Sequence, residues 1–112
     1  MPPLDPACLH LRAGDLAQLR QLLAHYVPQA QVWAYGSRVT GQSHDTSDLD
    51  LVLRNPGNMQ LPMEAFFDLK EAVQDSAIAI SVDLHDWAHL PEVFHRNIER
   101  AYVELQAGSG DE

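Results

Sequence analysis

The sequence predicts an α/β domain of the α+β kind, in which helices pack on one face of a small mixed β-sheet. Three observations support this prediction. Apolar residues recur at helical spacing in three segments, β-branched runs separate these segments, and Gly and Pro clusters mark the turns. With 112 residues, the chain has room for one core but none for a separate substrate-binding domain. We therefore expect one domain over 1–112, with an ordered core at about 13–106 and short disordered termini.

Three helices are predicted. The first covers residues 15–26, where leucines share one helical face and Pro28 follows the end. The second covers residues 63–73 and the third residues 89–100, each with apolar residues at helical spacing. The inner side of the second helix is expected to consist of Phe66, Phe67, Leu69, Lys70 and Val73.

Four strands are predicted around these helices. They cover residues 32–35, 48–53, 77–84 and 101–105. The polar segment 38–47 contains Gly41 and is expected to be a loop with one helical turn, and residues 55–58 have the composition of a turn. The resulting order, α-β-β-α-β-α-β, is typical of a sheet covered by helices.

Two aspartates on the second predicted strand form a candidate metal site. Asp48 and Asp50 share one face of the strand because side chains alternate along it. Their Cα atoms are expected about 6.6 Å apart, from a rise of about 3.3 Å per residue. Two carboxylates this close repel each other and are costly to bury without a cation. Mg²⁺, which prefers oxygen ligands, is the natural compensation.

A third carboxylate, Asp83, lies on the polar face of the next strand, together with Ser81 and His85. If the two strands are neighbours, Asp83 points to the same side as Asp48 and Asp50. Three carboxylates there would suit two metal ions about 3.5–4 Å apart, the arrangement used in phosphoryl transfer. The alternative is that an acidic protein carries acidic residues on the wet face of its sheet. Three aspartates in strands weaken that alternative, because Asp is depleted in strands.

The pair Gly36-Ser37 ends the first predicted strand, ten residues before Asp48. Glycine allows the backbone to approach a ligand closely, and the serine hydroxyl with the following N–H groups can hold phosphate oxygens. Arg38 follows directly and is a candidate to support a phosphate. For Arg38, a solvated loop arginine remains an equal alternative.

The combined pattern Gly-Ser-x10-Asp-x-Asp resembles the signature of the minimal nucleotidyltransferases of the DNA polymerase beta-like superfamily. The flanking residues 32–38, 46–51 and 82–84 also look like the corresponding segments of that family. The resemblance covers roughly residues 15–105. It implies the polymerase beta-like nucleotidyltransferase fold and an enzyme that transfers a nucleoside monophosphate from an NTP to a hydroxyl and releases pyrophosphate.

The resemblance also implies a role for each matching residue. Gly36 and Ser37 would hold the triphosphate, and Asp48 and Asp50 would bind two Mg²⁺ ions with the nucleotide phosphates. Asp83 would complete one metal site and act as the general base. Members of this family commonly pair with a helical HEPN-domain protein, and the better-understood ones neutralise that toxin by transferring AMP from ATP to a tyrosine. The chain is therefore expected to be the antitoxin of a two-component system.

Composition argues against some classes of binding partner and indicates the cellular compartment. A net charge of −9, from 7 Lys and Arg against 16 Asp and Glu, argues against direct binding to nucleic acid or to an anionic membrane. The lone Cys8 allows no internal disulfide, and no membrane span or signal peptide is recognisable, so we expect a cytoplasmic protein. A zinc site at His85, His89 and His95 is not expected, because the residues lack a zinc-binding pattern.

The short length indicates that the acceptor comes from another molecule. Two alternatives to protein modification remain open at this stage. The chain could be a nucleotide-binding subunit that masks its partner by complex formation without turnover, or it could act on a small molecule. The three carboxylates favour the enzyme over the masking subunit, and the missing acceptor-binding domain disfavours the small molecule.

Overall fold

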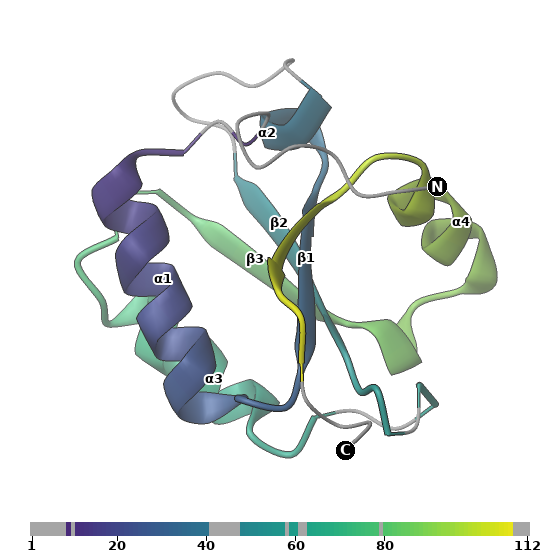
Figure 1. Ribbon diagram of the computed structural model, residues 1–112, viewed down its shortest axis with the longest axis horizontal. Coiled ribbons are helices and arrows are strands. Elements are labelled where there is room, and N and C mark those ends of the chain that lie inside the picture. The colour runs from purple at the N-terminus through teal and green to yellow at the C-terminus, as the bar shows by residue number, and fades with distance from the viewer. Residues whose placement is uncertain are drawn as a thin grey trace.

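The computed structural model describes residues 9, 11–40, 48–57, 59–60, 63–78 and 80–108. Its centre is a four-stranded sheet in the order β3-β2-β1-β4 (Figure 1). The strands are β1 (Gln31–Tyr35), β2 (Leu49–Arg54), β3 (Val82–Asp86) and β4 (Val103–Gln106). β1 runs antiparallel to both β2 and β4, whereas β2 and β3 are parallel. The predicted small mixed sheet is therefore confirmed.

Two helices, α1 (Ala13–Tyr26) and α3 (Phe66–Gln74), cover one face of this sheet (Figure 1). Leucines at every second position of β2 point towards them, because side chains alternate along a strand. The main core is built largely from fully buried aliphatic side chains of these elements. They include Leu19, Leu23, Leu49, Leu51, Leu53 and Leu69. The helices on one face that the sequence predicts are thus present.

A second, smaller cluster lies on the opposite face of the sheet. There the short 3-10 helix η2 (Trp87–His89) and helix α4 (Glu92–Arg100) pack against the other side chains of β1 and β2 (Figure 1). Its buried members are Trp33, Val52, Trp87, Ile98 and Tyr102. This second cover was not part of the prediction, because helical spacing shows that a helix buries one side but not which sheet face it covers.

The guanidinium of Arg54 lies over two tryptophan rings of this second cluster, which meet edge to face. Its Cζ is 3.9 Å from the ring centroid of Trp33 and 4.5 Å from that of Trp87. The ring of Tyr102 stacks on the far side of Trp33 at 3.8 Å. Both tryptophans are therefore parts of the core, and their rings are not free to stack on a base.

The predicted inner side of the second helix is partly wrong. Leu69 and Val73 are buried and Phe66 packs against the core, but Phe67 is 77% exposed and Lys70 is exposed as well. Buried positions spaced three and four apart form the inner stripe, which leaves positions 67 and 70 beside it. The helix also begins three residues later than predicted.

Two further boundaries differ from the sequence prediction. The third strand starts at Val82, although Ile78 and Ile80 before it still pack against the main core. The predicted third helix is divided into η2 and α4, with Pro91 at the N-cap of α4. The predicted single turn of helix is present as α2 (Ser37–Thr40), and the rest of that loop lies outside the described residues.

Candidate active site

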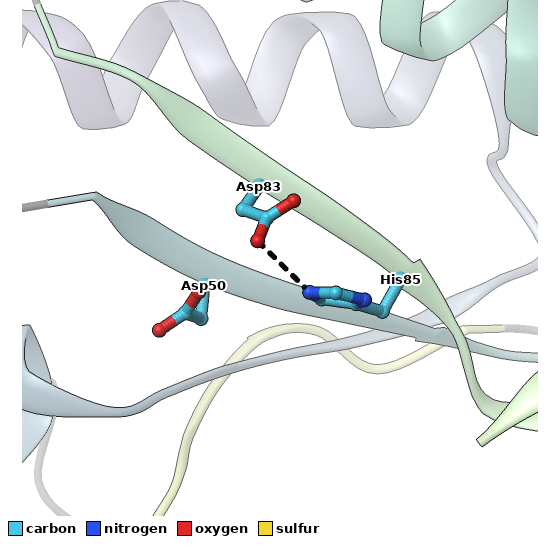
Figure 2. Close-up of side chains that lie close together, drawn as sticks. All are labelled: Asp50, Asp83 and His85. Carbon is cyan, nitrogen blue, oxygen red and sulfur yellow. Dashed lines mark hydrogen bonds and ion pairs between the residues drawn. The ribbon is translucent and has the colours of Figure 1, made fainter.

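Asp50 and Asp83 face each other across the two parallel strands. They are register partners in the β2–β3 pair, and their side chains lie on the sheet face opposite α1 and α3 (Figure 2). Side chains alternate along each strand, and the neighbouring residues Leu49, Leu51 and Leu84 are buried in the main core. The aspartates therefore point to the opposite face. The predicted neighbour relation between these strands is thus what brings the two carboxylates together.

His85 is the third member of this group. It lies two residues after Asp83 on the same face of β3, and its Nε2 is 3.1 Å from Asp83 Oδ2 (Figure 2). One donor atom from each of Asp50, Asp83 and His85 lies within 4.8 Å of the others. The sequence alternation had placed His85 on this face, but it had assigned no role to the imidazole.

Asp48 does not join these three donors. It precedes the first residue of β2, is exposed, and is absent from the donor group found among the described residues. It is still near enough to act on Asp50 through its charge. The structure therefore brings Asp50 and Asp83 together directly and leaves Asp48 at the edge of the site, where its metal role stays a prediction.

The electrostatics of the group favour a cation. Burial raises the pKa of Asp50 above its ordinary value, and the charges of Asp83 and Asp48 raise it further, while His85 acts in the opposite direction. Each cause that raises this pKa is a cost of holding negative charge at one place. A divalent ion would remove that cost, and two carboxylate oxygens with one imidazole nitrogen are suitable donors.

Tyr35 is a site residue that the sequence reasoning missed. It is the register partner of Asp50 on β1, and its ring centroid lies 6.3 Å from that of His85. Burial, followed by the charges of Asp50 and Asp83, raises the pKa of the Tyr35 phenol above its ordinary value. The phenol therefore stays protonated and can donate a hydrogen bond. Only the antiparallel register, which the sequence does not state, would have revealed this position.

Gly36 connects β1 to helix α2 next to the carboxylates. Its φ is +85°, and a Cβ atom at this position would lie 2.5 Å from Asp50 Oδ2. Its carbonyl accepts a hydrogen bond from the Val39 N–H at 3.0 Å, which starts the helical turn. Glycine is required here both by the left-handed backbone and by the close approach of Asp50.

Ser37 and Arg38 follow Gly36 and are the first two residues of α2. Ser37 begins α2, and its side chain lies outside the described part of the structure. Arg38 is only 4% exposed, which excludes the alternative of a solvated loop arginine. The phosphate-binding roles of Gly36, Ser37 and Arg38 stay predictions.

The three histidines considered for zinc do not converge. His95 stacks on Trp87 at 3.8 Å, and its Nε2 lies 2.7 Å from the Trp87 carbonyl oxygen. His89 is exposed at the end of η2, and His85 belongs to the carboxylate group.

Within the part of the chain that the structure describes, no helix is long and apolar enough to cross a membrane.

Comparison with known proteins identifies the family. The family described as polymerase beta nucleotidyltransferase matches residues 17–106. The chain is 39% identical over 100 residues to the probable protein adenylyltransferase MntA of Haemophilus influenzae, covering 89% of this chain and 86% of the relative. The resemblance found in the sequence motifs is thereby confirmed.

Solved structures show the same fold. A toxin–antitoxin crystal structure with AMP-PNP matches with a TM-score of 0.66 and 23% identity, covering 86% of this chain and 76% of that chain. The toxin–antitoxin MntA-HepT matches with a TM-score of 0.61 and 19% identity, over 89% and 76% of the two chains. These structures share the fold, whereas the family match over residues 17–106 and the 39% identical relative carry the conclusion: the chain belongs to the polymerase beta nucleotidyltransferase family and is a nucleotidyltransferase.

Proposed function

We propose that this nucleotidyltransferase moves AMP from ATP to a tyrosine of a HEPN-domain partner in the cytoplasm, and thereby acts as the antitoxin of a two-component system. The observation that carries the proposal is the pairing of Asp50 with Asp83 beside Gly36. This arrangement places two carboxylates next to a backbone turn that a triphosphate can approach. Its acceptor is a second protein, as the name of the Haemophilus influenzae relative, a probable protein adenylyltransferase, suggests.

The chemistry follows from the positions of these groups. The tyrosine oxygen attacks the α-phosphorus of ATP, a new P–O bond forms to the tyrosine, and the bond to the β-phosphate oxygen breaks to release pyrophosphate. Asp83, which is 52% exposed, takes the phenolic proton as general base. The turn at Gly36 and Ser37 holds the triphosphate. Asp50 and Asp83, with Asp48 at the edge, would hold two Mg²⁺ ions, which supply positive charge against the phosphate oxygens when bound.

Two comparisons support the choice of AMP and of a protein acceptor. The Haemophilus influenzae relative is named a probable protein adenylyltransferase. The solved structures of the same fold are toxin–antitoxin proteins, and one of them contains AMP-PNP.

The position of the label in ATP distinguishes this reaction from phosphorylation. The purified chain is incubated with Mg²⁺ and a HEPN-domain protein from the same organism, with ATP labelled at either the α- or the γ-phosphate. We expect label on the HEPN protein from α-labelled ATP only, an added mass of one AMP per modified tyrosine, and equivalent pyrophosphate. Transfer from γ-labelled ATP would contradict the proposal.

Matched variants test the site. Asp50→Asn and Asp83→Asn each keep the shape of the side chain and should reduce transfer at least about 100-fold. Asp68→Asn, an exposed position on α3 on the other face of the sheet, should transfer like wild type. A stable complex that inhibits the HEPN protein without any label would instead favour the masking subunit, and label only on small molecules would favour the third alternative.

A further inference from the structure

The donor group at the site contains a nitrogen as well as carboxylate oxygens. His85 and Asp83 project from the same face of β3, and Asp50 meets them from β2 (Figure 2). The side chains of His85 and Asp83 are 33% and 52% exposed, so a hydrated ion can reach both. The position of His85 is fixed by the strand rather than by a loop, which keeps the imidazole near the carboxylates.

The spacing of these donors suits one shared ion. Two ligands at neighbouring positions of an octahedral ion, with bonds of about 2.0–2.2 Å, lie about 3 Å apart. The 3.1 Å separation of His85 Nε2 and Asp83 Oδ2 has this value. The Asp50 oxygen lies within 4.8 Å of the other two donor atoms, so a rotation of its side chain would bring it to the same ion.

The chemistry of the donors then sets a preference among metals. Mg²⁺ selects oxygen ligands, whereas an imidazole nitrogen adds affinity for first-row transition ions. We propose that His85 is a direct metal ligand, with Asp50 and Asp83, and that it shifts the selectivity of this site towards divalent transition-metal ions relative to Mg²⁺. The proposal rests on the proposed function only in assuming that the reaction uses this same site.

A second role for His85 would be to orient Asp83 through their hydrogen bond without touching the ion. The two roles differ in what removal of the imidazole does to two metals. If His85 only orients Asp83, its removal disturbs the geometry of Asp83 and weakens Mg²⁺ and Mn²⁺ binding to the same degree. If His85 is a ligand, its removal weakens the binding of Mn²⁺, which accepts nitrogen, more strongly than the binding of Mg²⁺.

Mn²⁺ is the probe for the ligand itself, because it is paramagnetic. Electron spin-echo modulation is recorded on the full chain with substoichiometric Mn²⁺, without nucleotide or partner. We expect modulation from one directly bound ¹⁴N in wild type, and the ¹⁵N pattern when the protein is made with ¹⁵N-histidine. Wild type that binds no Mn²⁺, or that shows no nitrogen modulation, overturns the proposal.

Variants assign the nitrogen. His85→Asn should abolish the modulation and weaken Mn²⁺ binding about 10-fold or more, while Mg²⁺ binding, measured by competition, changes less than about 3-fold. His89→Asn, at an exposed position four residues along the chain, is the control and should behave like wild type. Persistence of the modulation in His85→Asn, or equal loss of both metals, would exclude direct ligation by His85.

The readout separates this proposal from the proposed function. AMP transfer can succeed with Mg²⁺ bound by oxygen ligands alone, in which case only the ligand role of His85 fails. Conversely, nitrogen modulation can be present in a chain that transfers nothing to the HEPN protein. Each outcome is measured independently of the other.

Discussion

The carboxylate of Asp50 occupies the space into which a side chain at Gly36 would project. A Cβ atom at position 36 would come within 2.5 Å of Asp50 Oδ2, and the backbone there has a φ of +85°. Gly36, which follows β1, thus leaves the space that Asp50 of β2 fills. Because any other side chain would push Asp50 away, the Gly-Ser turn and the carboxylates form one site rather than two adjacent motifs.

This contact predicts that Gly36→Ala and Asp50→Ala are coupled. We expect Gly36→Ala to lower the free energy of unfolding by about 1–3 kcal/mol in wild type, from the left-handed backbone and the clash together. In an Asp50→Ala background the clash is absent, so the cost should fall by about 1 kcal/mol. Urea unfolding of the four proteins measures this coupling.

Gly14 provides the matched control for that cycle. A Cβ there would meet nothing within 4 Å, and the residue lies in helix α1. Gly14→Ala should therefore be neutral or stabilise by up to about 1 kcal/mol, equally in both backgrounds. Additive effects of Gly36→Ala and Asp50→Ala would argue against the contact.

The raised pKa of Asp50 predicts that its charge destabilises the fold. Because folding raises this pKa above 3.8, the folded protein holds more protons than the unfolded chain between the two values. The folded state is therefore stabilised by protonated Asp50 at low pH. This stabilisation is lost as the pH rises through that window, and it stays lost above it. Asp50→Asn removes this penalty and should raise the Tm at pH 7 by about 2–5 °C.

The dependence on pH tests the cause. The difference in Tm between Asp50→Asn and wild type should shrink as the pH falls from the raised pKa of Asp50 towards 3.8, its ordinary value, and vanish below that value. Glu71→Gln, at an exposed position on α3, should show no comparable difference at either pH. A Tm of Asp50→Asn below that of wild type at pH 7 would indicate that Asp50 stabilises the fold without a cation.

A divalent metal ion should reverse the order of the Tm values of wild type and Asp50→Asn. An ion that binds only the folded state stabilises it by about 1.4 kcal/mol when its concentration is ten times the Kd. We expect Mg²⁺ to raise the Tm of wild type by several degrees and that of Asp50→Asn by much less. The measurement is a thermal melt over a Mg²⁺ titration at constant ionic strength, with Ca²⁺-free buffer and EDTA as the reference. Equal shifts in both proteins would place the ion away from Asp50.

Much of this site could be predicted from the sequence because strands alternate. The alternation in β2 and in β3 separates leucines from aspartates, and it predicts Asp83 and His85 on one face without reference to strand pairing. What alternation cannot supply is the register. The pairing of Asp50 with Asp83, and of Tyr35 with Asp50, depends on how three strands align, which is set by the whole sheet.

Helix boundaries and faces were less predictable for a related reason. Phe67 is strongly apolar, and its position next to Phe66 suggested burial, yet it lies beside the buried stripe of α3. The choice between neighbouring apolar residues depends on the angle at which the helix meets the sheet. Likewise, Val93 and Phe94 on α4 are 62% and 50% exposed, although their spacing fits an amphipathic helix.

The exposure of Phe67 gives a direct test of the packing of α3. Phe67→Ala should change the free energy of unfolding by no more than about 0.5 kcal/mol, since it removes few contacts. Leu69→Ala, two residues later and fully buried, should cost about 3 kcal/mol. Urea unfolding of both variants compares them under the same conditions. A larger loss for Phe67 than for Leu69 would mean that the helix is rotated about its axis.

The contacts of Arg54 with two tryptophan rings predict a stabilising role that charge alone does not provide. Its guanidinium lies over the rings of Trp33 and Trp87 and donates to the side-chain oxygen of Gln31. Lysine at this position would keep the charge but lose the planar stacking surface and the fixed donor geometry. We expect Arg54→Lys to lower the free energy of unfolding by about 1–2 kcal/mol.

An exposed arginine on the opposite side provides the comparison. Arg20→Lys on α1 should stay within about 0.5 kcal/mol of wild type, because its guanidinium has no aromatic partner among the described ring contacts. Near-ultraviolet circular dichroism should change in Arg54→Lys and not in Arg20→Lys, since only the first alters the surroundings of both tryptophans. If Arg54→Lys were as stable as wild type with an unchanged spectrum, the two rings would be held by their apolar contacts with Tyr102 and Ile98, and the guanidinium would contribute nothing measurable to the fold.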